Sequence, residues 1–185
     1  MVAGFLAEVG IPFTDLVDRP AEMATDTASV LPAILGCLYA AETLLGRECE
    51  EFVHLQATSP TRMVEDIVGA VALLHESGAD NIITGQEAKC SPYFSLAETA
   101  KDGSVHLSKT IDRPAVRRQD APLCFDMNGS IYVWRRNLFC QQPAVFYRNT
   151  RIFVMPQDRS VDIDTELDFA LAEIVMRRRE SGKTA

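Results

Sequence analysis

Apolar residues recur at helical and strand spacings in alternation through the first half of the chain. A long helical pattern covers residues 27–45, and the run EFVHLQA, residues 51–57, is typical of a buried strand. Pro60 opens a second helical pattern that continues to His75, and a short apolar strand follows at residues 81–84. Strand, helix and strand in this order predict an α/β fold, a mostly parallel sheet with helices on both faces. Because ligands on such sheets bind beyond the carboxyl ends of the strands, the loop QATSPTR is a candidate site.

The middle of the chain has a different pattern. Residues 86–120 are polar and rich in turns, with two short strand-like pieces, YFSLAE and SVHLSK. We interpret them as a small antiparallel flap inserted within a single domain, residues 1–185. Such a flap could cover a site or pair with a second subunit. The strand-like runs MNGSIYVW and TRIFVMP then return the chain to the main sheet.

The segment RSVDIDTELDF, residues 159–169, carries four carboxylates within seven residues. Like charges this close raise one another's pKa values, so the fold must compensate for them. A helix start is one explanation, because Thr165 and Asp168 match the capping-box pattern and Asp164 is an alternative N-cap. Acidic groups there also favour the positive end of the helix dipole. The apolar residues that follow at helical spacing predict one buried helix face: Leu167, Ala170, Leu171, Ile174 and Val175.

Asp162 has no place in that capping scheme. In VDID, residues 161–164, the side chains of an extended chain alternate, so Asp162 and Asp164 would project to the same side. Two carboxylates that converge just before a helix suit Mg²⁺, which proteins usually hold with one or two carboxylates plus substrate phosphates. Because D-x-D is a common pattern, the spacing by itself leaves both explanations open.

Composition and charge narrow the class of protein. The chain has 185 residues, 47% hydrophobic and 24% charged, which is ordinary for a globular domain. Its net charge of −8 argues against a nucleic-acid partner, whose phosphates would need basic residues. The five cysteines form no C-x-x-C pair, which favours a reduced cytoplasmic location over a zinc or disulfide framework. The first residues resemble no signal peptide, and the most apolar run, residues 29–41, is too short to cross a membrane.

Several polar residues have local structural explanations. Thr58 and Ser59 are expected to cap the helix that follows them, and Arg62 to be a surface charge of that helix. The arginines at 177–179 are expected to form a solvated helix end, where cations are favourable. Structural roles are also expected for the histidines, which have no acidic or cysteine partner at ligand spacing: His54, His75 and His106.

Five segments in order resemble the family of CMP-sialic acid synthetases, the acylneuraminate cytidylyltransferases. They are RPAEMATDTAS (19–29), LQATSPTR (55–62), RRQDAP (117–122), NGSIYV (128–133) and RSVDIDTELDF (159–169). The segments SPYFSLAE and CFDMNGSIYVW are most similar in sequence to bacterial members that activate sialic-acid-like nonulosonic acids, including legionaminic acid. The resemblance implies a nucleotide-diphospho-sugar transferase type of fold. It also implies transfer of CMP from CTP to the anomeric hydroxyl of a nonulosonic acid, with release of pyrophosphate.

The same resemblance implies roles for individual residues. Asp162 and Asp164 would be catalytic and bind Mg²⁺, Arg19 and Ala28 would bind the nucleotide, and Gln56, Arg118, Tyr132 and Phe146 would bind the sugar. Arg118 would reach the site of the partner subunit in a homodimer, where a guanidinium can grip the sugar carboxylate with two hydrogen bonds. Plainer alternatives are a solvated loop charge for Arg19, a backbone-satisfied amide for Gln56 and core aromatic residues for Tyr132 and Phe146.

Two departures from the family pattern limit these expectations. The family's opening strand and its basic, glycine-containing loop for the CTP phosphates have no counterpart here, so we expect the 185-residue chain to bind CTP poorly and to be of doubtful activity. Asp126 stands where several sialic-acid-activating members carry arginine, which argues against N-acetylneuraminate as the substrate. The alternatives are CMP transfer to another acidic sugar, or a truncated, non-catalytic remnant that binds sugar or dimerises.

Overall fold

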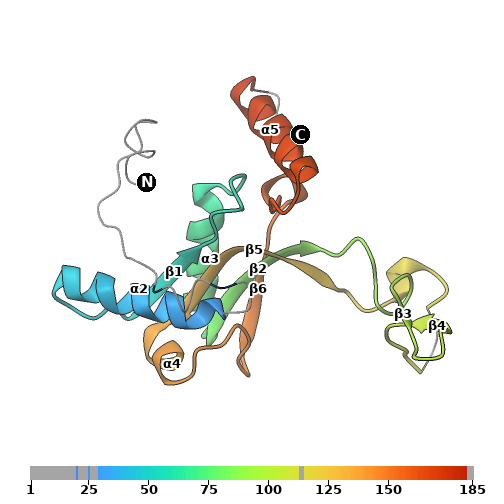
Figure 1. The fold of residues 1–185 in the computed structure, drawn as a ribbon, viewed down its shortest axis with the longest axis horizontal. Helices are drawn as coiled ribbons and strands as arrows, with labels where there is room; N and C mark the ends of the chain where they lie inside the picture. Colours follow the sequence, from blue (N-terminus) through green and yellow to red (C-terminus); the bar gives the residue numbers. More distant parts are fainter. Residues whose placement is uncertain (1–19, 21–24, 26–28, 113–114, 183–185) are drawn as a thin grey trace. The chain divides into compact units, whose positions relative to one another are not determined.

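The computed structural model describes residues 20, 25, 29–112 and 115–182. They fall into two compact units, one within the bounds Met1–Phe52 and Arg135–Val145 and the other within Val53–Trp134 and Phe146–Ala185. The elements follow one another as in Figure 1: α2 (Val30–Leu45), β1 (Glu51–Leu55), α3 (Val64–Ser77), β2 (Asn81–Glu87), β3 (Ala97–Thr99), β4 (Val105–Leu107), the 3₁₀ turn η2 (Arg118–Asp120), β5 (Phe125–Arg135), α4 (Arg136–Gln141), β6 (Thr150–Val154), the 3₁₀ turn η3 (Gln157–Arg159) and α5 (Glu166–Glu180). None of the described helices is long and apolar enough to span a membrane.

The main sheet is mixed, in the order β1-β5-β2-β6. Strand β6 runs parallel to β2, but β5 runs antiparallel to it. The predicted α/β class is therefore confirmed, whereas a mostly parallel sheet is not. The reason lies in the connection, because the chain leaves β2, makes its excursion and returns directly beside β2 in the opposite direction. Helices on both faces of this sheet remain a prediction.

Strand β1 is not the buried strand that its apolar sequence predicts. Its residues are half-buried or exposed, with Leu55 exposed at its end. By contrast, the first five residues of β2 are all buried. Position in the sheet explains the difference, since β1 lies at an edge and β2 lies between two other strands.

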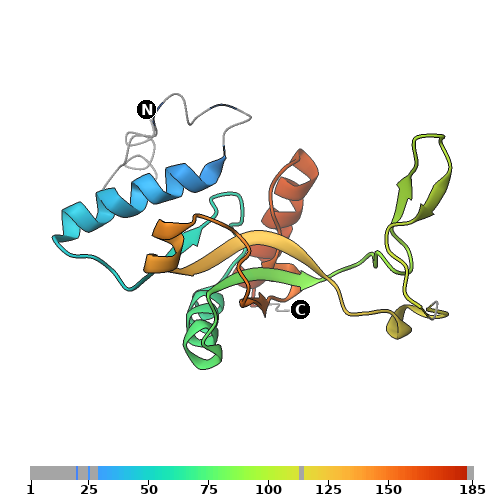
Figure 2. The same cartoon turned by 90° about the horizontal axis from the view of Figure 1, so that it is seen from below.

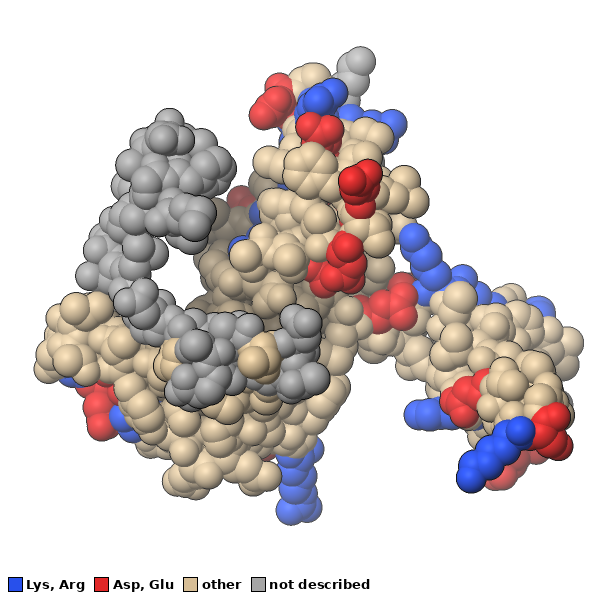
Figure 3. All heavy atoms as spheres, viewed as in Figure 1, with Lys and Arg blue, Asp and Glu red and all other residues tan. Residues whose placement is uncertain are grey.

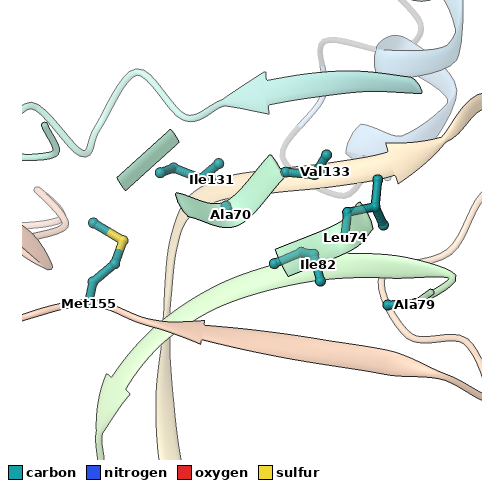
Figure 4. Packing of buried hydrophobic residues seen from close by; sticks show 7 residues of the cluster. All are labelled: Ala70, Leu74, Ala79, Ile82, Ile131, Val133 and Met155. Carbon is teal, nitrogen blue, oxygen red and sulfur yellow. The ribbon is translucent and has the colours of Figure 1, made fainter. Parts of the chain in front are cut away.

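The core of the second unit forms where α3 packs on the sheet. Figure 4 shows its buried side chains, which come from α3, β2, β5 and the segments beside them: Ala70, Leu74, Ala79, Ile82, Ile131, Val133 and Met155. Helix α3 approaches β6 so closely that a Cβ atom on Gly69 would lie 2.6 Å from the ring of Phe153. A larger residue at position 69 would therefore push the helix off the sheet.

Helix α3 begins later than its sequence pattern predicts. Its N-cap is Met63, whose backbone N–H donates to the Asp66 carboxylate at 2.8 Å. Asp66 is only 1% exposed, and Arg159 pairs with it at 3.3 Å. The prediction that Thr58 and Ser59 cap this helix is wrong, because residues 56–63 form an irregular loop before it.

Helix α5 confirms the predicted capping box. Thr165 is its N-cap and accepts from the Asp168 N–H, while the Asp168 carboxylate accepts from the Thr165 N–H at 2.9 Å. Asp164 is therefore not the N-cap. The predicted buried face is also wrong, because Ala172 is the buried residue described in α5 and Leu167 is 78% exposed. Figure 3 shows acidic and basic side chains along the surface of this helix.

The excursion between β2 and β5 contains the predicted antiparallel pair. Strands β3 and β4 pair with Ala97 opposite Leu107, and both views in Figures 1 and 2 show this hairpin apart from the four-stranded sheet. The arm that carries it is closed by a backbone hydrogen bond of 2.9 Å from the Ala88 N–H to the Cys124 carbonyl. We call residues 88–124, which lie between β2 and β5, the flap.

The first unit contains a charged pair that the fold buries. Arg136 in α4 donates to both oxygens of Glu42 in α2, at 2.8 and 3.0 Å, and the Cys49 N–H donates to the same carboxylate at 3.0 Å. The hydrogen bonds from Arg136, followed by the one from Cys49, lower the pKa of Glu42 from 4.5 to about 2. The folded state therefore stabilises the ionised form of Glu42.

From this ion pair we expect the free energy of unfolding to decrease in acid. Since the pKa of Glu42 is lower in the folded state, its contribution is complete above about pH 4.5 and is lost as the pH falls towards about 2. The Glu42→Gln variant should be clearly less stable than the wild type at pH 7, and the difference should shrink below pH 4.5. Urea unfolding from pH 7 to pH 3 measures this.

Glu48 provides the matched control, because it also contacts Arg136, at 2.9 Å, but is 72% exposed. An exposed ion pair contributes little, so Glu48→Gln should unfold like the wild type at every pH. Equal acid sensitivity of the Glu42→Gln variant and the wild type would contradict the assignment.

Candidate functional site

The predicted sugar-binding residue Gln56 lies directly beyond the carboxyl end of β1. Its backbone N–H donates to the Ser130 carbonyl at 3.1 Å, which ties the start of the loop to β5. Its side-chain oxygen lies 3.3 Å from His54 Nε2. Because an amide oxygen only accepts, His54 donates through Nε2, and the NH₂ group of Gln56 is left to donate to a ligand.

His54 lies half-buried beside Gln56 and Arg62, and its structural role stays a prediction. Burial lowers its pKa, the positive charge of Arg62 acts in the same direction, and the hydrogen bond to Gln56 opposes both. At neutral pH the ring is therefore uncharged. Its ring centroid lies 6.0 Å from that of Tyr132, so the histidine links Gln56 to the aromatic face of β5.

A wide bulge in β5 sets the positions of residues 128–131. The β2–β5 register moves from Ile83 opposite Tyr132 to Gly85 opposite Met127, which leaves residues 128–131 facing Thr84. Gly129 takes a φ of 62°, a left-handed conformation that glycine adopts without strain. Bulges of this kind re-aim side chains near functional sites.

A buried polar network fixes this bulge. Asn128 Oδ1 accepts from the Thr84 hydroxyl at 2.7 Å and from the Ser130 N–H at 3.2 Å. Asn128 Nδ2 donates to the Ser160 hydroxyl at 3.0 Å. Ser160 stands two residues before Asp162, so the network connects the bulge to the acidic segment.

The acidic segment is also held from the side of the β1 loop. The Ile163 N–H donates to the Thr58 carbonyl at 2.9 Å, and the Val161 N–H donates to the Thr61 hydroxyl at 3.3 Å. Asp162 is thus fixed by its two neighbours, through their backbone atoms, whatever its own side chain binds.

The carboxylate of Asp162 converges with Tyr132 over the bulge. A Cβ atom built on Gly129 would lie 3.8 Å from both Asp162 Oδ2 and the Tyr132 hydroxyl. Burial, and then the negative charge of Asp162, raise the pKa of Tyr132, so the phenol stays protonated. The Tyr132 ring stacks on the buried Trp134 at 5.1 Å between ring centroids. We call Gln56, His54, Gly129, Tyr132 and Asp162 the Asp162 cluster.

One carboxylate oxygen of Asp162 is suited to bind a cation. Asp162 Oδ1 is buried and has no hydrogen-bond partner within the described part of the chain. A buried carboxylate oxygen is costly unless a charge or a donor satisfies it. Among the described residues, no three acidic, histidine or cysteine side chains are grouped so that they could hold a metal by themselves. Asp162 and the exposed Asp164 are nevertheless compatible with Mg²⁺, which commonly takes one or two carboxylates and completes its shell with waters and substrate phosphates.

Arg118 and Phe146 lie elsewhere, at the base of the flap. Arg118 donates to the Ala88 carbonyl and lines a cavity of about 280 Å³. Phe146 is 62% exposed and lines a second cavity of about 580 Å³ beside Met127. Neither Gln56, Tyr132 nor Asp162 lines either cavity. The expected nucleotide-binding residues Arg19 and Ala28 lie outside the described residues.

Arg62 ties the loop after β1 together through its guanidinium. One of its nitrogens donates to the carbonyls of Gln56 and Ser59, at 2.6 and 2.7 Å, and approaches that of Ser130 at 3.5 Å. Burial lowers its pKa, so it is not the surface charge of α3 that we predicted. The sequence signal that could have identified it is its place at the end of the loop after β1, where a cation can satisfy several free carbonyls.

Comparisons with known proteins cover most of this chain. No protein-family model matches it. It is 35% identical over 161 residues to the post-translational flagellin modification protein B of Campylobacter coli, a match to 87% of this chain and 67% of the relative. It is 35% identical over 158 residues to the CMP-N,N'-diacetyllegionaminic acid synthase of Campylobacter jejuni, a match to 85% of this chain and 66% of the relative. A third relative, an N-acylneuraminate cytidylyltransferase of Streptococcus agalactiae, is 28% identical over 154 residues, covering 83% of this chain and 36% of the relative. The chain thus spans about two thirds of the length of the first two relatives and about a third of the third.

Proposed function

The chain belongs to the family of CMP-sialic acid synthetases, the acylneuraminate cytidylyltransferases, and from this membership we propose that the protein transfers CMP from CTP to the anomeric hydroxyl of a nonulosonic acid. The single observation that carries the proposal in the structure is the buried Oδ1 of Asp162, for which the described residues supply no hydrogen-bond partner. It lies in the segment that tertiary hydrogen bonds hold beside the loop after β1. The relatives' names favour an enzyme over a non-catalytic remnant.

In the proposed reaction the anomeric oxygen attacks the α-phosphorus of CTP. The new P–O bond forms as the bond to the bridging oxygen breaks, the hydroxyl loses its proton, and pyrophosphate leaves with the electron pair. Mg²⁺, when bound, would neutralise phosphate charge and lower the pKa of the attacking hydroxyl. Asp162 and Asp164 would hold it and are the residues that we assign to catalysis.

The other residues of the Asp162 cluster would orient the acceptor sugar. The NH₂ group of Gln56 is available as a donor because His54 occupies its oxygen. The protonated Tyr132 hydroxyl can donate as well. Trp134 fixes the orientation of the Tyr132 ring by stacking on it. Arg19 and Ala28 would contact the cytidine. These groups bind and position the substrates, which is most of what phosphoryl transfer requires from a protein.

We propose an acceptor of the legionaminic acid type and a cytoplasmic enzyme. Support comes from the relative that is named for this sugar and is 35% identical, compared with 28% for the relative named for N-acylneuraminate. Asp126, which accepts from the Lys89 N–H at 3.2 Å, adds to this, because several members that activate sialic acid carry arginine at that position. Another acidic sugar remains the second candidate.

The function is tested with the full-length protein, CTP and Mg²⁺. Pyrophosphate release is measured with N,N'-diacetyllegionaminic acid, N-acetylneuraminic acid and an eight-carbon acidic sugar at equal concentrations. We expect the legionaminic acid to give the highest kcat/KM. A preference for one of the other sugars would replace the proposed acceptor, and release with none of them would refute the proposed transfer.

Arg118 is proposed to act across a homodimer. The flap that carries it would place its guanidinium on the sugar carboxylate in the partner's site. Mixed dimers of an Arg118→Ala subunit and an Asp162→Asn subunit would then contain one intact site and one site with both defects. Purified through two different tags, they should have about half the activity of the wild-type dimer, although each variant alone is inactive.

The control is the corresponding dimer in which one subunit carries both substitutions and the other is wild type. In that dimer every site has one defect if Arg118 acts across the interface, so the activity should be lost. If it keeps half of the activity while the first mixed dimer has none, Arg118 acts within its own subunit.

A further inference from the structure

The three arginines in the last turn of α5 have different surroundings. Arg177 pairs with Glu173 on the same helix, at 3.3 Å, and its side chain is 75% exposed. Arg178 is exposed as well. Arg179 is only 20% exposed and turns towards the loop after β1 and the turn after β6. The solvated helix end expected from the sequence is therefore wrong for this one residue.

The guanidinium of Arg179 bridges two segments that are far apart in sequence. Its Nη1 donates to the Thr61 carbonyl at 2.5 Å. Its Nη2 donates to the Asp158 carbonyl at 2.9 Å and to the Asp158 carboxylate at 3.3 Å. A planar guanidinium holds several donors in a fixed geometry, so it can set the distance between two acceptors in a way that a lysine cannot.

Both bridged segments hold Asp162. Thr61 accepts from the Val161 N–H through its hydroxyl, and the loop that contains it accepts from the Ile163 N–H at the Thr58 carbonyl. Asp158 lies in η3, which leads directly into Ser160 and the acidic segment. A change in the distance between Thr61 and Asp158 would therefore move the backbone on both sides of Asp162.

We propose that Arg179 is a positioning residue that fixes the Asp162 carboxylate for metal binding. The proposal rests on the proposed function only in that the cation at Asp162 serves CMP transfer. Among the described residues, Arg179 donates to Thr61, Met63 and Asp158 and not to Asp162, so it would act through the backbone of residues 58–61 and 158–163. Outer partners of metal-binding groups typically change metal affinity by about 10- to 100-fold. A side chain that merely anchored the end of α5 would change thermal stability and leave metal affinity unaltered.

The test compares three variants of the full-length protein. Arg179→Ala removes the bridge, Arg179→Lys keeps the charge and the aliphatic stem but not the planar fork, and Arg178→Ala is the matched control one residue away. Mn²⁺ serves as the probe for the metal site, and the free ion is measured by electron paramagnetic resonance. Asp162→Asn defines the signal of a protein without the site. Hydrogen exchange of peptides covering residues 56–62 and 158–165 reports on the two bridged segments without any ligand.

We expect Arg179→Ala to weaken Mn²⁺ binding about tenfold and Arg179→Lys to restore only part of it. Exchange in both peptides should become faster in Arg179→Ala, while Arg178→Ala matches the wild type in every measurement. The proposal is overturned if Arg179→Ala binds Mn²⁺ as tightly as Arg178→Ala, or if the wild type shows no Mn²⁺ binding that depends on Asp162. If Arg179→Ala does not fold, Mn²⁺ binding of wild-type strength by Arg179→Lys overturns it.

Turnover is measured separately, so that the two proposals can fail independently. A wild type that binds Mn²⁺ through Asp162 but releases no pyrophosphate with any sugar refutes the proposed function and leaves the positioning role standing. A wild type that turns over normally, together with an Arg179→Ala variant of unchanged Mn²⁺ affinity, refutes the positioning role alone.

Discussion

Replacing Asp162 by asparagine should abolish Mg²⁺-dependent CMP transfer, with kcat at least about a thousandfold lower, and leave the fold nearly unchanged. Asparagine has almost the same shape as aspartate, and the backbone on both sides of residue 162 is held by Thr58 and Thr61. What is lost is the negative charge on the buried Oδ1, which has no hydrogen-bond partner among the residues that the structure describes. Pyrophosphate release across a Mg²⁺ titration, together with thermal unfolding, measures both parts of this result.

Asp168→Asn is the matched control for this variant. Asp168 is a carboxylate of the same segment, but its oxygen accepts from the backbone and hydroxyl of Thr165, at 2.9 and 2.7 Å. Its replacement should weaken the cap of α5 only slightly, because asparagine keeps an acceptor oxygen, and should cause no large loss of turnover. If Asp162→Asn kept its rate at saturating Mg²⁺, the assignment of the metal to Asp162 would be wrong.

Replacing Asn128 by alanine should cause the largest loss of stability among single changes near the site, about 3 kcal/mol. The change leaves the buried Ser130 N–H without its acceptor and removes one partner each from the hydroxyls of Thr84 and Ser160. Each buried polar group left unsatisfied costs about 1–3 kcal/mol. For a chain of this size such a loss lowers the unfolding temperature by roughly 6–12 °C.

The same variant should also lower turnover below what its stability explains. Asn128 is the link between the bulge that carries Gly129 and the Ser160 that precedes Asp162. Assays well below the unfolding temperature separate this effect from unfolding. Asn137→Ala, at an exposed position, should change neither stability nor rate. A loss of less than about 1 kcal/mol in Asn128→Ala would show that water replaces the amide in this network.

Features that depend on contacts within a few residues could be predicted from the sequence. The capping box of Thr165 and Asp168 spans three residues and is present as predicted. The helical pattern at residues 27–45 corresponds to α2, and the two short strands of the flap pair as expected. Family membership could also be recognised, because the motifs preserve the order of residues without any need for a model of their packing.

Other features were decided by tertiary structure, because they depend on partners that the sequence does not identify. Arg179 and Thr61 are 118 residues apart, and Arg62 and Ser130 are 68 apart. No local pattern distinguishes Arg179 from its solvated neighbours, and for Arg62 the position after β1 is the only local signal, which does not identify Ser130 as a partner. The exposure of β1 and of the apolar residues of α5 likewise depends on which elements lie beside them. The periodicity of apolar residues predicts which side chains share a face, and only the packed fold determines whether that face is covered, since burial is a property of the neighbours as much as of the residue.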